Sequence, residues 1–345
     1  MPLLPLAATF LIALLASLAL SALAVRLGVR LGVADAPGGR RKHRRTTSRL
    51  GALPLFGAFV LSAMVSRLFF VPTRDGNEQT RFAGLMLGGV IAFVVAILDD
   101  KFELPSGPQF AGQAGAAFVA IGSLIFIERF RNPFSNSEQL LPFTVTVAIT
   151  LFWFIGMMNT VNFLDGVDGL AASVSLVATV LTLIHMLREG QYSVALIPMA
   201  LIGTLLGFLA FNFQPARLFL GGGAMYLGFV LACIGIVAGA KIALLLLVMG
   251  LPIADVAWQM VDRARRGRSP TSGDRGHLHL RLADAGWSAR RIVAAYTSVC
   301  IVFGGVALIS QPPLFKLMTL GALFLAVIIV LLRLSRQGSF DVEAS

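Results

Sequence analysis

Charged residues are scarce in this chain. Of its 345 residues, 13% are charged and 57% are hydrophobic, and the mean hydropathy is strongly positive. A soluble domain of this length would carry far more charge, so the composition excludes a water-soluble globular protein. The sequence instead indicates a protein that is built for lipid.

Cysteine and histidine are scarce as well. The chain has two cysteines, Cys233 and Cys300, and both fall inside long hydrophobic runs. We expect them to be small core residues, which excludes a disulfide framework. His277 and His279 lie two residues apart, but no cysteine and no third histidine is near them. This absence argues against a zinc site.

Long hydrophobic runs, by contrast, fill most of the chain. A helix needs about 20 residues to cross a hydrocarbon core of about 30 Å. Runs of roughly this length occupy residues 3–25, 50–71, 82–98, 109–127, 140–158, 169–187, 192–211, 218–240, 242–260, 292–310 and 314–332. We therefore predict an all-α polytopic membrane protein with about 11 transmembrane helices in a single domain, residues 1–345. Only Gly239 and Lys241 interrupt the eighth and ninth runs, so ten spans is the alternative.

Positive charges are distributed unevenly between the loops. With eleven spans, twenty of the 28 lysines and arginines fall on one side of the membrane. Positive loops stay in the cytoplasm, so we expect the N-terminus outside and the C-terminus in the cytoplasm. The net charge of +11 is carried by basic loops that lie beside a membrane in this prediction. That position favours membrane lipids and phosphorylated substrates as partners, and not nucleic acid.

Polar residues gather on this same side, although they were not used to assign it. The candidate active-site loops are 26–49, 99–108, 159–168, 212–225 and 261–291. The first is a basic, turn-rich lip with Arg41 and His43, which would attract phosphate or serve only as a positive-inside signal. Asp99 and Asp100 are adjacent carboxylates that repel each other. They suit a divalent cation or a general base, and the alternative is an ordinary helix-end pair.

The segment 159–170 is the most informative one. Asn159 and Asn162 lie three residues apart, as do Asp165 and Asp168, so a helical turn places each pair on one face. Such groups are costly at a membrane edge unless they face water or a ligand. They suit Mg²⁺, or the hydrogen-bonding edge of a base and ribose. The alternative is a solvated loop that is rich in turn-forming residues.

The last polar loop combines histidines with arginines. His277 and His279 have Arg275 and Arg281 on either side, which favours contact with phosphate or sugar. Asp255 lies inside the ninth predicted span, where a charge is costly, so we expect a functional or pairing role for it.

Taken together, these motifs resemble those of the polyprenyl-phosphate N-acetylhexosamine-1-phosphate transferases, over roughly residues 35–282. The first loop is similar to the family's Asp-x-Pro-x-x-Arg-Lys-x-His lip, and Asp99-Asp100 matches its acidic pair. Residues 159–170 match its Asn-x-x-Asn-x-x-Asp-Gly-x-Asp-Gly-Leu motif without a gap. The loop 267–280 is similar to the branch that uses N-acetylglucosamine, and not to the branch that transfers muramoyl-pentapeptide.

The chain departs from the family's pattern at two positions. Gly222 occupies the place of an aspartate that such enzymes use to hold Mg²⁺, and Leu280 replaces the third histidine of a His-x-His-His motif. Hard cations need charged oxygen donors, so one carboxylate fewer is expected to weaken metal binding. The alternative function is therefore a catalytically impaired member that acts as a nucleotide-sugar- and lipid-binding scaffold.

The resemblance implies a phosphotransferase that moves a sugar-1-phosphate from UDP-N-acetylglucosamine or a related UDP-sugar to undecaprenyl phosphate. Such a step starts the synthesis of lipid-linked cell-wall polysaccharide, on the cytoplasmic face of the bacterial inner membrane. The resemblance implies Mg²⁺ or Mn²⁺ as cofactor, held by Asp99, Asp100 and Asn162, with Asp99 or Asp100 also acting as the catalytic base. Substrate binding falls to Asn159, Asp165, Asp168, Arg275, His277, His279, Arg41 and His43. A homodimer is left open.

Overall fold

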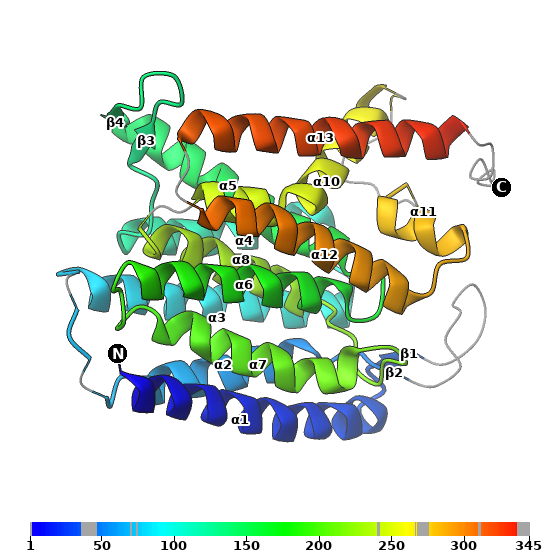
Figure 1. Ribbon diagram of the computed structural model, residues 1–345. Coiled ribbons are helices and arrows are strands. Elements are labelled where there is room, and N and C mark those ends of the chain that lie inside the picture. The colour runs from blue at the N-terminus through cyan, green and yellow to red at the C-terminus, as the bar shows by residue number, and fades with distance from the viewer. Residues whose placement is uncertain are drawn as a thin grey trace.

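The computed structural model describes residues 2–35, 47–69, 71–73, 75–239, 242–265, 267, 276–309 and 312–336. Within these ranges the chain folds into thirteen α-helices and two small antiparallel sheets of two strands each. Most of the helices run side by side along one direction, so that the molecule has two ends (Figure 1).

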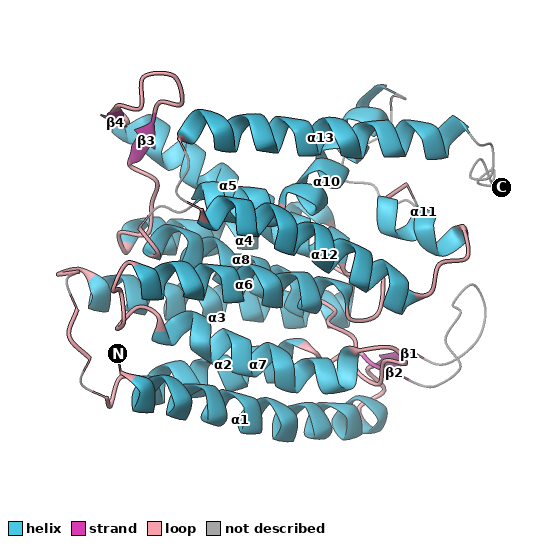
Figure 2. Ribbon diagram, viewed as in Figure 1, coloured by secondary structure: helices cyan, strands magenta, loops and turns pink. Residues whose placement is uncertain are grey.

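The first half of the chain contains α1 (Leu3–Arg30), β1 (Ala34–Asp35), β2 (Thr47–Ser48), α2 (Ala52–Ser66), α3 (Glu78–Phe102), α4 (Ser106–Gly122), β3 (Arg129–Arg131), β4 (Glu138–Leu140) and α5 (Phe143–Leu164). The second half contains α6 (Leu170–Arg188), α7 (Leu196–Asn212), α8 (Gly223–Val237), α9 (Ile242–Val248), α10 (Gly250–Arg265), α11 (Leu278–Asp284), α12 (Ala289–Leu308) and α13 (Pro313–Arg336). Strands β1 and β2 pair with each other, as do β3 and β4 (Figure 2).

The strands and α11 mark the two ends. The β1–β2 pair, α11 and the last residues of α13 lie at one end, while the start of α1 and the β3–β4 hairpin lie at the other (Figure 1). We call the first of these the polar end, because the candidate site lies there. Strand β2 is tied to a segment far along the chain, since Ser48 O accepts the N–H of Phe219 at 2.8 Å.

Helix α8 is the centre of the core. All 15 of its residues are buried, and it packs against α3 and α5. Its close contact with α5 depends on Gly228, because a Cβ there would lie 2.5 Å from the Met158 Cα. Small residues allow such close approach of helices within a membrane protein.

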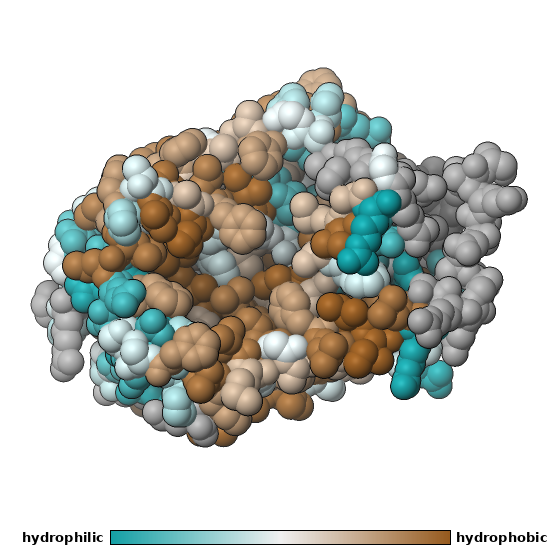
Figure 3. All heavy atoms as spheres, turned by 90° about the horizontal axis from the view of Figure 1, so that it is seen from above, coloured by the Kyte–Doolittle hydropathy of each residue, from teal (hydrophilic) through white to brown (hydrophobic). Residues whose placement is uncertain are grey.

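Six described helices are long and apolar enough to cross a membrane, namely α1, α3, α5, α6, α12 and α13. The pair α9–α10 makes a seventh if it counts as one broken span, and α2, α7 and α8 are apolar but shorter. In the view from above, hydrophobic side chains cover the middle of the molecule, and polar ones gather toward its ends (Figure 3). The prediction of an all-helical polytopic membrane protein is confirmed, whereas the count of about 11 spans and the orientation stay predictions.

One predicted span is not a continuous helix. The run 242–260 is divided between α9 and α10, whose axes differ in direction by 74°. Pro252 gives a physical reason for the break, because its nitrogen has no hydrogen to donate to the preceding turn and its ring crowds that turn. The sequence predicted a single uninterrupted span over 242–260, so the bend was missed.

Candidate active site

Two carboxylates from distant helices meet at one turn of the polar end. Asp100 lies in the last turn of α3, and its Oδ1 accepts the N–H of Gly222 at 2.8 Å. Asp165 follows the last residue of α5. Its carboxylate accepts the N–H of Gly221, the residue immediately before Gly222. Successive N–H groups of the turn before α8 therefore bind a carboxylate each, at a helix N-terminus that favours negative charge.

Glycine is required at both positions of this turn. Gly221 has a φ of +57°, and a Cβ there would lie 2.5 Å from Asp100 Oδ1. A Cβ on Gly222 would lie 2.3 Å from the main-chain oxygen of Ala96 in α3. The main chain of the turn thus lies directly against α3, with no room for a side chain.

The charges at this turn are only partly compensated. Burial raises the pKa of Asp165 well above its usual range, the hydrogen bond from Gly221 opposes this shift, and the nearby charges of Asp100 and Asp168 add to it. Asp100 is 8% exposed, and its Oδ2 is buried without a hydrogen-bond partner among the described residues. Two like charges and an unpaired carboxylate oxygen are an arrangement that a cation stabilises.

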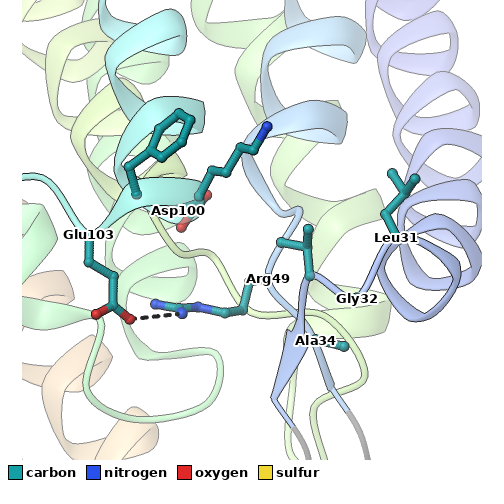
Figure 4. A pocket seen from close by; sticks show the side chains of 9 residues that line it. Leu31, Gly32, Ala34, Arg49, Asp100 and Glu103 are labelled. Carbon is teal, nitrogen blue, oxygen red and sulfur yellow. Dashed lines mark ion pairs between the residues drawn. The ribbon is translucent and has the colours of Figure 1, made fainter.

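A cleft of about 470 Å³ opens beside Asp100. It lies between the end of α1, the start of β1 and the end of α3, and Arg49 crosses it to form an ion pair with Glu103 at 3.6 Å (Figure 4). Lys101 also lines the cleft. The ion pair is largely exposed, with side-chain exposures of 31% and 77%. Exposed pairs contribute little free energy, so an anion can displace Glu103 from Arg49.

The adjacent residue Asp99 faces another group of partners. Its Oδ1 accepts the main-chain N–H of Leu104 at 3.0 Å and the side-chain N–H of Gln109 at 2.6 Å. It thereby holds the turn between α3 and α4. The structure places Asp100 with Asp165 and does not place Asp99 on the same turn.

The remaining residues of the 159–170 motif lie around Asp165. Asn159 donates to Gln113 Oε1 at 2.8 Å and so joins α5 to α4. Asp168 accepts the N–H of Ala216 at 3.2 Å, which ties the loop after α5 to the segment before α8. Asn162 lies one helical turn after Asn159, and no hydrogen bond of its side chain occurs among the described residues.

The histidines of the last loop are inside the protein. His277 and His279 are 4% and 1% exposed, and His277 donates from Nδ1 to Asp255 at 3.2 Å. Burial lowers the pKa of His279 from its usual 6.5 to about 4, with Asp255 opposing the shift and His277 adding to it. The ring of His279 fills the space beside Gly166, where a Cβ would lie 2.5 Å from its Nε2. Three candidate residues, Arg41, His43 and Arg275, lie outside the described residues.

Two features of the site were not predicted from the sequence. The first is the pair of N–H donors at Gly221 and Gly222, because that segment was read for the carboxylate it lacks. A run of three glycines before a hydrophobic helix was the available signal. The second is Arg49, which entered the prediction only as the last residue of the loop 26–49. Its place in the cleft follows from the pairing of β1 with β2, which the sequence did not indicate.

Comparisons with known proteins find similarity over the part of the chain that carries the candidate site. Residues 82–239 match the model of glycosyl transferase family 4. The chain is 30% identical over 342 residues to a decaprenyl-phosphate N-acetylglucosaminephosphotransferase of Mycobacterium tuberculosis (strain CDC 1551 / Oshkosh), covering 90% of this chain and 85% of that protein.

Two further relatives come from other bacteria. One is an undecaprenyl-phosphate alpha-N-acetylglucosaminyl 1-phosphate transferase of Yersinia pestis, 28% identical over 311 residues, or 86% of this chain and 81% of that protein. The other is a phospho-N-acetylmuramoyl-pentapeptide-transferase of Geobacillus kaustophilus, 28% identical over 285 residues, or 77% of this chain and 84% of that protein. In each of the three comparisons the similarity therefore extends over most of this chain and most of the relative.

Proposed function

The chain belongs to glycosyl transferase family 4, and we propose that it transfers N-acetylglucosamine-1-phosphate, or a related N-acetylhexosamine-1-phosphate, from a UDP-sugar to undecaprenyl phosphate. Two of the relatives above are named for N-acetylglucosamine and for undecaprenyl or decaprenyl phosphate. The observation that carries the proposal is the meeting of Asp100 and Asp165 beside a cleft that holds Arg49 and Lys101.

The proposed reaction exchanges one phosphoanhydride bond for another, and the ester bonds to the sugar and to the lipid stay intact. An oxygen of the lipid phosphate attacks the phosphorus that carries the sugar. The bond from that phosphorus to the bridging oxygen of the diphosphate breaks, and UMP leaves with this oxygen. Since both reacting groups are anionic, the protein must hold them in line and offset their charge.

We propose that residues of the cleft do this. Arg49 and Lys101 are cationic donors that bind phosphate oxygens, and Arg49 can exchange Glu103 for a phosphate. Asp100 lies in the cleft wall, from which it can orient the lipid phosphate or take its remaining proton. Asn159 and Asp168 belong to the same 159–170 segment as Asp165 and are proposed to bind the nucleotide.

Mg²⁺, or Mn²⁺ in its place, is proposed as the cofactor. The residues fit such an ion, because Asp100 Oδ2 is buried without a partner among the described residues and Asp165 lies near it. The described residues hold no group of three or more Asp, Glu, His or Cys suited to a metal, so neutral oxygens such as that of Asn162 must complete the ligand set. When bound, the ion would neutralise charge on the diphosphate.

The proposed activity predicts a large effect of Asp100→Asn. Purified protein is incubated with UDP-N-acetylglucosamine, undecaprenyl phosphate and Mg²⁺, and the release of UMP is followed. We expect Asp100→Asn to lower kcat by about 100-fold or more, because a group that orients the reacting phosphate is lost. The matched control is Asp75→Asn, which makes the same change at the opposite end, where Asp75 pairs with Arg81. Full activity of Asp100→Asn would contradict the proposal.

A binding scaffold is the second candidate, and Gly222 is the observation that favours it. In place of the carboxylate of its family's pattern, this position offers only an N–H, which Asp100 already accepts. Calorimetry with UDP-N-acetylglucosamine separates the two candidates. Binding without release of UMP, for this and other UDP-sugars, supports the scaffold.

A further inference from the structure

Asp255 is a buried carboxylate that the proposed reaction does not use. It lies in α10 and is 2% exposed, so that its charge is costly unless it is paired. Both of its oxygens have partners. Oδ1 accepts the main-chain N–H of Leu278 at 2.9 Å, and Oδ2 accepts from His277 Nδ1 at 3.2 Å. One carboxylate thus holds both the main chain and the side chain where α11 begins.

These bonds determine which nitrogen of His277 carries the proton. When Nδ1–H is donated to Asp255, Nε2 is left as an acceptor, and it faces Arg263 Nη2 at 3.4 Å. A guanidinium has only donors, so this second contact requires the same tautomer. A hydrogen-bonded series therefore links Asp255 to His277 and His277 to Arg263, and in each link a donor meets an acceptor.

This hydrogen-bonded series packs against the residues that precede Asp165. The ring of His277 stacks on Phe163 with the centroids 5.3 Å apart, and the Arg263 guanidinium lies 5.9 Å from the centroid of the same ring. Phe163 belongs to the last turn of α5, two residues before Asp165.

The neighbouring histidine continues the contact past Asp165. His279 lies beside His277, with the ring centroids 5.7 Å apart, and its own ring occupies the space next to Gly166. Asp255 therefore anchors the ring of His277, and that ring lies beside the ring of His279. Together the two rings contact the polypeptide on both sides of Asp165, although Asp255 itself is on another helix.

We propose that Asp255 is a positioning residue of the active site, which holds His277 in the Nδ1–H tautomer and through that ring places Arg263 and the segment 163–166. The inference rests on the proposed function, because Asp165 is a site residue only if that reaction takes place. It gives His277 a role inside the protein, in place of the direct contact with diphosphate and sugar that the sequence suggested.

The variant Asp255→Asn tests the proposal. Asparagine can still accept from Leu278 through Oδ1, but its amide donates to His277 Nδ1. The proton of His277 then moves to Nε2, where it opposes the donors of Arg263. We expect kcat to fall roughly 10- to 100-fold, with a smaller change in KM for UDP-N-acetylglucosamine, since the reacting groups are misplaced and binding is retained.

A double-mutant cycle with His277→Asn separates positioning from general support of the fold. If Asp255 acts through His277, Asp255→Asn has little further effect on kcat once His277 is replaced. Equal effects of Asp255→Asn in both backgrounds would overturn the proposal. Asp75→Asn, combined with His277→Asn, is the control for two independent sites.

Histidine labelled with ¹⁵N gives a readout that does not depend on activity. In the full-length protein we expect the His277 signal, identified by its loss in His277→Asn, to show Nδ1–H, and Asp255→Asn to change it to Nε2–H. A wild-type Nε2–H form, or no change on mutation, would overturn the proposal. If the wild type releases no UMP from any UDP-sugar, the proposed function fails, and with it the role of Asp255 in catalysis, whereas an Nδ1–H signal would still establish the tautomer.

Discussion

At the scale of single residues, neighbours in the sequence take different roles. Asp99 holds the turn to α4 through Leu104 and Gln109, whereas Asp100 binds the turn before α8. Adjacent residues of a helix point in different directions, so two such carboxylates cannot share one set of partners. The two carboxylates of this acidic pair therefore have different partners, and the catalytic and metal-binding roles of Asp99 stay predictions.

The ring of His279 should make stability depend on pH. Its pKa is lowered from 6.5 to about 4 by burial. As the pH falls, the unfolded chain takes up a proton near pH 6.5, while the folded protein does so only near pH 4. Between these two pH values only the unfolded state binds the proton. The free energy of unfolding therefore falls as the pH drops from about 6.5 to about 4.

The variant His279→Gln should remove this part of the pH dependence. For the wild type we expect a loss of roughly 3 kcal/mol over the window, since each pKa unit corresponds to about 1.4 kcal/mol. The unfolding temperature is measured in detergent at several pH values between 7.5 and 4. Parallel curves for the two proteins would show that another group is responsible.

At the scale of elements, the turn at 221–222 and the start of α8 organise the candidate site. Its N–H groups bind Asp100 and Asp165, and its main chain lies against Ala96 of α3. The same turn follows the segment that pairs with β2, which leads into Arg49. One glycine-rich turn therefore brings together residues of α3, α5 and the first loop.

Restoring an aspartate at Gly222 should not restore a metal ligand in this fold. A Cβ at this position would lie 2.3 Å from the Ala96 oxygen, so we expect Gly222→Asp to destabilise the protein by roughly 1–3 kcal/mol and to lower UMP release. Thermal unfolding and the UMP assay measure both effects. The control is Gly107→Asp, where a Cβ meets nothing within 4 Å. Higher activity of Gly222→Asp would show that α3 and α8 can separate.

At the scale of the whole molecule, the fold places Asp100, Asp165 and the basic residues Arg49 and Lys101 at one end. Helices of alternating direction carry these residues from distant positions to the polar end (Figure 1). The opposite end carries the β3–β4 hairpin. The positive-inside rule predicts that the polar end faces the cytoplasm.

Labelling of single cysteines tests this orientation. The native Cys233 and Cys300 are fully buried, so they should not react. We expect Ser135→Cys, in the exposed hairpin, to react with a membrane-impermeant maleimide in intact cells. Ala285→Cys, at the polar end, should react only in inverted vesicles. The reverse pattern would place the candidate site outside the cytoplasm.

The sequence by itself determined the class of the protein and most of the residues that meet at the site. Scarce charge and recurring hydrophobic runs indicate segments that lie in lipid. Because lipid offers no hydrogen-bond partners, such segments form helices, which satisfy their main-chain hydrogen bonds internally. The carboxylates at 99–100 and 165–168 stood out because buried charge in a membrane protein needs a reason. The bent span, by contrast, was missed.

Only the tertiary structure decided which of these residues act together. The separation of Asp99 from Asp100, the N–H donors of Gly221 and Gly222, and the link from Asp255 to His277 all depend on contacts between segments far apart in the chain. Hydropathy and local motifs carry no information about such distances. A main-chain donor looks the same at every residue of a sequence, and its role appears only when folding brings a carboxylate to it.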